Sequence, residues 1–206
     1  NTDFVFGVAT SSFQIEGGLD SRLPCIWDTF CTKPGAIRDG SHGAVACDHI
    51  RLWREDVELI QSLGVDAYRL SLSWPRVMQQ NGELNPTGVA FYRDLLGALK
   101  AQGIRTFVTL YHWDLPQYLE DRGGWVNRDT AYQFRHYADL VSQALGELVD
   151  SYATLNEPFC SAFLGYETGI HAPGHQSQAM GRQAAHHLLL AHGLAMPVLR
   201  RNAPHA

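Results

Sequence analysis

Residues 151–158 of this 206-residue chain contain the side chains best suited to chemistry. A short run with strand character leads into Asn156 and Glu157, and a proline follows. Because proline cannot donate a ladder hydrogen bond and favours an extended residue before it, we expect a strand to end here with Glu157 at its carboxyl end. A carboxyl group beside a hydrogen-bonding amide suits general acid/base chemistry on a glycosidic oxygen. An acidic residue at a helix N-terminus, a common structural arrangement, explains the same residues equally well.

Glu157 is the one strong carboxylate candidate. Glycosidases that retain or invert the anomeric configuration normally place two carboxylates across the scissile bond. The sequence stops at Ala206 without a second acidic residue in a comparable setting. We therefore expect the catalytic nucleophile to be absent from these 206 residues.

The elements that would position Glu157 alternate between strands and helices. Short runs of β-branched and aromatic residues predict strands, and apolar residues at helical spacing predict amphipathic helices. Strands are expected over residues 4–10, 67–72, 104–110 and 152–155, and helices over about 52–63, 86–102, 134–148 and 178–200. Strands joined by crossover helices form a parallel α/β sheet. Four such units are half of the eight that a closed (β/α)8 barrel needs.

Several segments lead to more specific expectations. The connection over residues 11–48 is unusually long, so we expect it to carry function or to cover one end of the domain. We expect the run 4–10 to be buried, and Pro197 to bend or end the last helix. If the sheet stays open, its inward face should leave apolar side chains such as Val108 and Leu110 against water, and its outer strands should keep unpaired backbone groups.

Composition narrows the class of protein. A net charge of −5, with 45% hydrophobic and 18% charged residues, is ordinary for a globular chain and gives no basic surface for nucleic acid. No apolar run is long enough to cross a bilayer, and the first residues lack the features of a signal peptide. Four scattered cysteines are expected to be free, mostly buried thiols. These features predict a cytoplasmic protein without nucleic-acid or membrane partners.

A cluster of potential metal ligands lies in the long connection. His42, Cys47, Asp48 and His49 have the right chemistry, but their spacing and ligand count are poor for zinc. We therefore expect no metal site.

Four motifs carry a resemblance to a known family. They are FGVATSSFQIEG at residues 6–17, YRLSLSWPR at 68–76, YHWDLP at 111–116 and TLNEP at 154–158. Each follows or spans an expected strand, and together they resemble the signatures of glycoside hydrolase family 1, the β-glucosidase family. The resemblance runs through the whole chain.

Membership would imply a (β/α)8 TIM barrel of which residues 1–206 are the amino-terminal half, with only the first four β/α units. It would also imply a retaining β-glycosidase without a cofactor, in which Glu157 matches the general acid/base. The residues that match sugar-binding positions of the family are Gln14, His112 and Asn156. Trp113 belongs to the same rim, and Arg69 matches an arginine beside the nucleophile. Burial of that guanidinium in a strand also favours a carboxylate partner.

Two functions therefore remain open. One is a retaining β-glycosidase acting on a β-glucoside or a related small saccharide. The other is a catalytically inactive half-barrel that binds sugar or serves in assembly. An open half-barrel also predicts self-association or a complementing carboxyl-terminal half.

Overall fold

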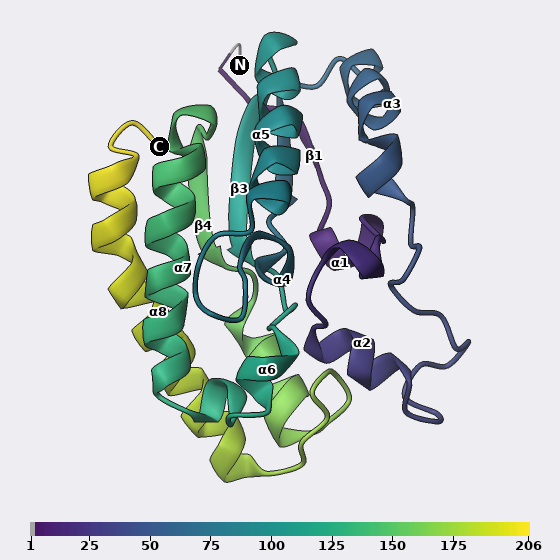
Figure 1. Ribbon diagram of the computed structural model, residues 1–206, viewed down its shortest axis with the longest axis vertical. Helices are drawn as coiled ribbons and strands as arrows, with labels where there is room; N and C mark the ends of the chain where they lie inside the picture. The colour runs from purple at the N-terminus through teal and green to yellow at the C-terminus, as the bar shows by residue number, and fades with distance from the viewer. Residues whose placement is uncertain (1–2) are drawn as a thin grey trace.

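The computed structural model describes residues 3–206 and contains a parallel sheet with the strand order β1-β2-β3-β4. The strands are β1 (Gly7–Ala9), β2 (Ala67–Ser71), β3 (Arg105–Tyr111) and β4 (Ser151–Leu155). Four long helices lie on one side of this sheet (Figure 1). They are α3 (His49–Ser62), α5 (Pro86–Ala101), α7 (Asp129–Leu145) and α8 (Gln178–Asn202). The expected alternation of four strands with four helices is confirmed.

Short helices gather at the carboxyl ends of the strands, below the sheet in Figure 1. They are α1 (Ser12–Ile15), η1 (Leu19–Ser21), α2 (Ile26–Cys31), α4 (Trp74–Val77), α6 (Gln117–Glu120), η2 (Gly124–Val126) and the π-helix η4 (Cys160–Glu167). A single short helix, η3 (Gly146–Leu148), leads into the amino end of β4. The long connection after β1 forms α1, η1 and α2 and covers this end of the sheet, as expected.

The ends of the long helices follow their local chemistry. Asn85 accepts a hydrogen bond from the backbone N–H of Thr87 at 3.2 Å and caps α5. Gly64 follows α3 with a φ of 65°, a left-handed conformation that glycine adopts at little cost. Pro197 lies inside α8, and the helix continues beyond it to Asn202.

The helix-facing side of the sheet forms part of the core. Leu70, Val108 and Leu110 are all buried in one cluster with residues of the long helices. The expectation that Val108 and Leu110 would face water is therefore wrong. The alternate residues of the strands, among them the half-buried Arg69 and Phe107, occupy the other face.

Strand β1 is shorter and more exposed than expected. Only Gly7–Ala9 pair with β2, and the side chains of Phe4 and Phe6 are 62% and 65% exposed. The prediction of a buried strand over residues 4–10 is therefore wrong at its start, because β1 lies at an edge of the sheet and its first residues have no layer over them.

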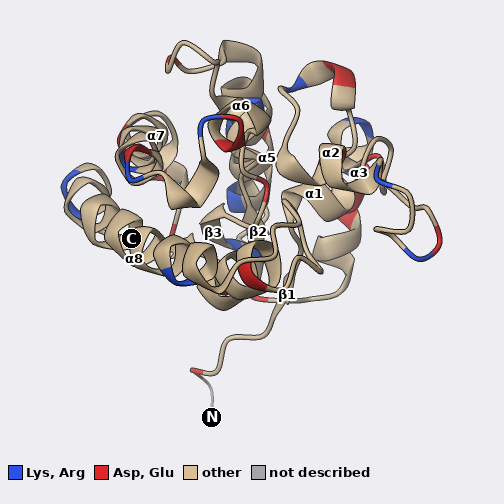
Figure 2. Cartoon of the chain, turned by 90° about the horizontal axis from the view of Figure 1, so that it is seen from below, with Lys and Arg blue, Asp and Glu red and all other residues tan. Residues whose placement is uncertain are grey.

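Residues of both charges are interspersed over the helices and loops (Figure 2). Among the described residues, no helix is long and apolar enough to cross a membrane. The cysteines are free, as expected, but only Cys25 is buried. Cys31 and Cys160 are half-buried and Cys47 is exposed, so the prediction of mostly buried thiols is wrong.

Trp125 has hydrogen-bond partners in three other elements of the molecule. Its backbone N–H donates to the Tyr166 hydroxyl at 3.0 Å, and its indole N–H donates to the Tyr111 hydroxyl at 3.0 Å. The Trp125 carbonyl oxygen lies 2.9 Å from Nδ1 of His187 in α8. The Tyr166 hydroxyl also donates to Glu120. This buried network joins η2 and α6 to the π-helix, β3 and α8.

Gly124 is the position where this network tolerates no side chain. Its φ is 52°, and an added Cβ would overlap the Glu120 carboxylate and the Tyr166 hydroxyl. We expect Gly124→Ala to lower the free energy of unfolding by about 3 kcal/mol, through backbone strain and loss of these contacts. Urea unfolding measures the change.

Gly97→Ala in α5 is the matched control, because an added Cβ there meets nothing within 4 Å. It should stabilise the protein by up to about 1 kcal/mol through helix propensity. Equal stability of the Gly124→Ala protein and the parent protein would show that the network around Trp125 is not rigid.

Candidate active site

Asn156 is the centre of the carboxyl end of the sheet. Its backbone N–H donates to the Tyr111 carbonyl oxygen at 2.9 Å, and its own carbonyl oxygen accepts from Nε1 of Trp113 at 2.9 Å. Its side-chain Oδ1 accepts from Nη2 of Arg69 at 2.6 Å, and its Nδ2 lies 3.1 Å from Nε2 of His112. Four of the residues predicted from sequence therefore meet in one hydrogen-bonded group.

Glu157 follows directly and lies exposed at the end of β4. A helical segment begins at Pro158, so Glu157 is both a strand-end carboxyl group and an acidic residue at a helix N-terminus. Its φ is 43°, an uncommon conformation for a residue with a side chain. The Cys160 thiol donates a weak hydrogen bond to Glu157 Oε2 at 3.4 Å. The interpretation of Glu157 as a strand-end carboxyl group and its interpretation as a helix N-terminal acid therefore describe the same geometry.

His112 and Trp113 extend the group from the end of β3. Burial and, after it, the charge of Arg69 together lower the pKa of His112 to about 4, and Glu157 opposes the shift. The imidazole is therefore neutral near pH 7. Trp113 has a φ of 78°, and its indole N–H···O=C bond to Asn156 holds this strained backbone.

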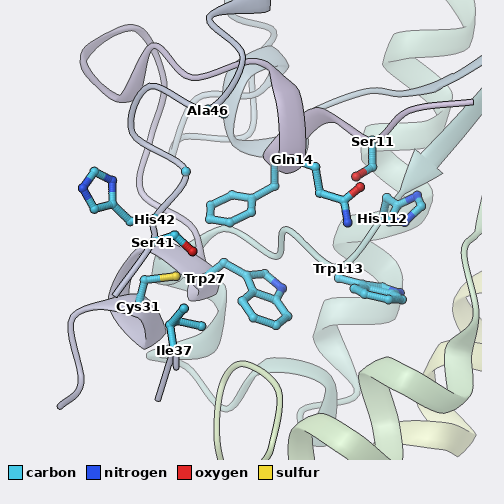
Figure 3. A pocket seen from close by; sticks show the side chains of 12 residues that line it. Ser11, Gln14, Trp27, Cys31, Ile37, Ser41, His42, Ala46, His112 and Trp113 are labelled. Carbon is cyan, nitrogen blue, oxygen red and sulfur yellow. The ribbon is translucent and has the colours of Figure 1, made fainter. Parts of the chain in front are cut away.

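Gln14 lines the same pocket as His112 and Trp113. It is exposed on α1, and its side chain points into a cavity of about 380 Å³ together with the rings of Trp27 and Trp113 (Figure 3). The cavity is lined by Ser11, Phe13, Gln14, Trp27, Cys31, Ile37, Ser41, His42, Gly43, Ala46, His112 and Trp113. Apolar walls with a few polar groups are typical of a small-molecule site.

Two buried groups hold α1, and with it Gln14, against the sheet. On one side, the Ser12 backbone N–H donates to the Ser71 hydroxyl at 2.8 Å, and the Ser12 hydroxyl donates to Asp114 Oδ2 at 3.0 Å. On the other side, Arg76 Nε donates to Glu16 Oε2 at 2.9 Å, and both side chains are almost fully buried. Hydrogen bonding at both ends gives the short helix a fixed place.

No carboxylate pairs with Arg69 among the described residues. The guanidinium instead donates to Asn156 Oδ1 and, through Nε, to the Thr109 hydroxyl at 3.1 Å. These neutral acceptors satisfy two donors of a half-buried cation and orient it along the end of the sheet.

Four further residues lie in this region that were not predicted to belong to it, namely Trp27, Ile37, Asp114 and His171. The centroid of the His171 ring lies 5.5 Å from that of Trp27 and 5.4 Å from that of Trp113, so the histidine packs against both rings. Asp114 lies within the YHWDLP motif at residues 111–116. Trp27 and Ile37 lie in the long connection, whose tertiary contacts leave no periodic pattern of apolar residues in the sequence. No group of three or more metal-ligating side chains is found in the described part of the chain.

Asp114 provides a stability test of this arrangement. Its Oδ1 is buried and has no partner in residues 3–206. Burial raises the pKa of the Asp114 carboxyl from 3.8 to about 6, and the negative charge of Glu16 adds to the shift. Since the native carboxyl binds its proton more tightly than the unfolded one, its contribution to stability is complete below about pH 4 and is lost as the pH rises through about 6.

We expect Asp114→Asn to remove this pH dependence. At pH 7 the variant should be more stable by about 2–3 kcal/mol, since one pKa unit corresponds to about 1.4 kcal/mol. Below pH 4 the difference should vanish. Chemical denaturation at a series of pH values measures both limits, and a variant that is less stable than the parent protein at pH 7 would contradict the buried-acid assignment.

Comparisons with known proteins agree with this geometry. The sequence model of glycosyl hydrolase family 1 matches residues 1–206. A β-glucosidase of Agrobacterium sp. is 48% identical over 205 residues, which cover 98% of this chain and 45% of that protein. The chain thus spans about half the length of the curated relatives it matches.

Solved structures give the same result. An enzyme named AHE from Alicyclobacillus herbarius superposes with a TM-score of 0.96 at 52% identity, over 98% of this chain and 46% of that one. A Thermotoga maritima β-glucosidase in complex with glucoimidazole superposes with a TM-score of 0.96 at 42% identity, over 100% of this chain and 48% of that one. The four-stranded parallel sheet is accordingly part of a TIM barrel, as expected. The chain belongs to glycosyl hydrolase family 1.

Proposed function

We propose that this chain is the acid/base half of a retaining β-glycosidase, with β-glucosides as its preferred substrates. The observation that carries the proposal is the placement of Glu157 beside Asn156, which is hydrogen-bonded to Arg69 and lies against His112. The β-glucosidase names of the relatives support the same substrate class. Gln14, His112 and Asn156 would hold the sugar hydroxyls, and Trp113 would form part of the wall.

Glu157 would act twice in the reaction. As an acid, its carboxyl would protonate the glycosidic oxygen while a second carboxylate attacks the anomeric carbon and the leaving group departs. As a base, it would then take a proton from the water that cleaves the glycosyl-enzyme ester. The second carboxylate would come from the half of the family sequence that residues 1–206 do not match, and Arg69 would lie next to it.

Replacement of Glu157 in the natural polypeptide tests this assignment. We expect Glu157→Ala to reduce hydrolysis of β-glucosides with poor leaving groups by about 10²–10⁴-fold, since these need protonation. Aryl β-glucosides with activated leaving groups should keep their first step. Azide should restore turnover and yield a β-glycosyl azide, because the vacated space admits a small anion to the glycosyl-enzyme.

Glu147→Ala is a matched control, since Glu147 is an exposed acid in η3, at the opposite end of β4. It should leave every rate unchanged. An α-configured azide product, or full activity of Glu157→Ala on poor leaving groups, would contradict the assignment.

The second candidate is an inactive half-barrel that binds sugar or assembles with a complementing chain. It is favoured by the edge strands β1 and β4, which pair on one side only within the described sheet. In that case the pure protein would bind β-glucosides without releasing p-nitrophenol above background. Such a protein would self-associate or pair with a carboxyl-terminal half.

A further inference from the structure

We propose that Arg69 is a positioning residue that sets the hydrogen-bonding direction of Asn156 and, through it, the tautomer of His112. The site then offers an acceptor nitrogen at His112 and a donor N–H at Asn156. The part of this inference that concerns the sugar rests on the proposed function.

The hydrogen bonds of Arg69 have a fixed direction. A guanidinium has five N–H donors and no acceptor. Nε donates to the Thr109 hydroxyl at 3.1 Å, and Nη2 donates to Asn156 Oδ1 at 2.6 Å. A flipped Asn156 amide would place its NH2 against the guanidinium, donor against donor, so the amide has one favourable orientation.

The orientation of the Asn156 amide decides which atom of it faces His112. Because Oδ1 of Asn156 faces Arg69, Nδ2 faces His112 Nε2 at 3.1 Å. An amide N–H can only donate, so Nε2 must carry its lone pair, and the proton of the neutral imidazole is on Nδ1. Burial and the charge of Arg69, which lower the pKa of His112 to about 4, exclude the doubly protonated ring near neutral pH.

The tautomer of His112 is selected at its Nε2 atom. In most sites the hydrogen bond of one ring nitrogen decides which nitrogen is protonated. Nδ1 of His112 is buried and has no partner among the described residues, so it gives no preference of its own. The selection therefore comes from Asn156, and behind it from Arg69.

This arrangement has a consequence for recognition. A hydroxyl that meets His112 has to donate to Nε2, as a second donor that shares its lone pair with the Asn156 N–H, while a hydroxyl that meets Asn156 can accept from the other N–H of Nδ2. A fluorine atom in place of the first hydroxyl accepts at best weakly and cannot donate, so it should bind as poorly as hydrogen. The same replacement at a hydroxyl that only accepts should be tolerated better.

Nitrogen NMR of the intact natural polypeptide, labelled with ¹⁵N-histidine, reads the tautomer directly without substrate. His112, assigned through His112→Gln, should show a protonated Nδ1. Asn156→Asp, which turns the facing donor into an acceptor, should move the proton to Nε2. Arg69→Met, which frees the amide to rotate, should give a mixture of both tautomers.

His187 is the internal control, because its Nδ1 faces the Trp125 carbonyl oxygen at 2.9 Å and neither Arg69 nor Asn156 is its hydrogen-bond partner. Its signals should stay those of the Nδ1–H form in every variant. If a variant does not fold, the parent spectrum still decides: a protonated Nε2 on His112 would overturn the proposal, as would an unchanged tautomer in both folded variants.

Binding of deoxy- and deoxyfluoro-glucoses tests the consequence for the sugar. Affinity is used because fluorine also slows bond cleavage through its electron withdrawal. The hydroxyl that contacts His112 is identified as the one whose removal has no further effect on binding to the His112→Gln variant. At that position, replacement of the hydroxyl by hydrogen and replacement by fluorine should both weaken binding to the parent protein by about 10- to 100-fold. Recovery of affinity by fluorine at that position would overturn the acceptor role. If the tautomers are those expected in the parent protein and the variants but no glycoside is bound or cleaved, the positioning role of Arg69 is supported and the proposed function fails.

Discussion

The carboxyl end of this sheet depends on the complete hydrogen bonding of Asn156. Its backbone N–H and C=O join it to Tyr111 and Trp113, and its side chain joins it to Arg69 and lies against His112. These partners come from β2 and β3, so a single residue after β4 fixes the relative positions of three strand ends. Glu157 is the next residue, so the hydrogen bonds of Asn156 also fix where the backbone of Glu157 lies.

Backbone strain is concentrated in the same region. The non-glycine residues with positive φ in the described chain are Ala46, Asp48, Trp113 and Glu157. Ala46 and Trp113 line the pocket, and Glu157 is the proposed acid/base. Such conformations persist where surrounding contacts over-determine them. The indole bond of Trp113 to Asn156 and the buried anchors of α1 supply contacts of this kind.

Sequence predicted the strand ends well, because proline, the Asn-Glu pair and the family motifs mark them directly. Gln14, His112, Asn156 and Glu157 were all assigned from such local signals, although their roles remain proposals. The orientation of Val108 and Leu110 was predicted incorrectly, since a period of two identifies alternate faces without showing which face meets the helices. Trp27, Ile37 and the acceptor Thr109 were missed because their contacts join segments that are distant in sequence.

A crystal structure of the Glu157→Gln protein, at its natural length and soaked with an aryl β-glucoside, tests the central claim most directly. The account predicts sugar hydroxyls at hydrogen-bonding distance, about 2.7–3.2 Å, from the Gln14 amide, His112 Nε2 and Asn156 Nδ2, with the glycosidic oxygen facing the side chain at position 157. An ordered sugar bound elsewhere, with this rim empty, would contradict it.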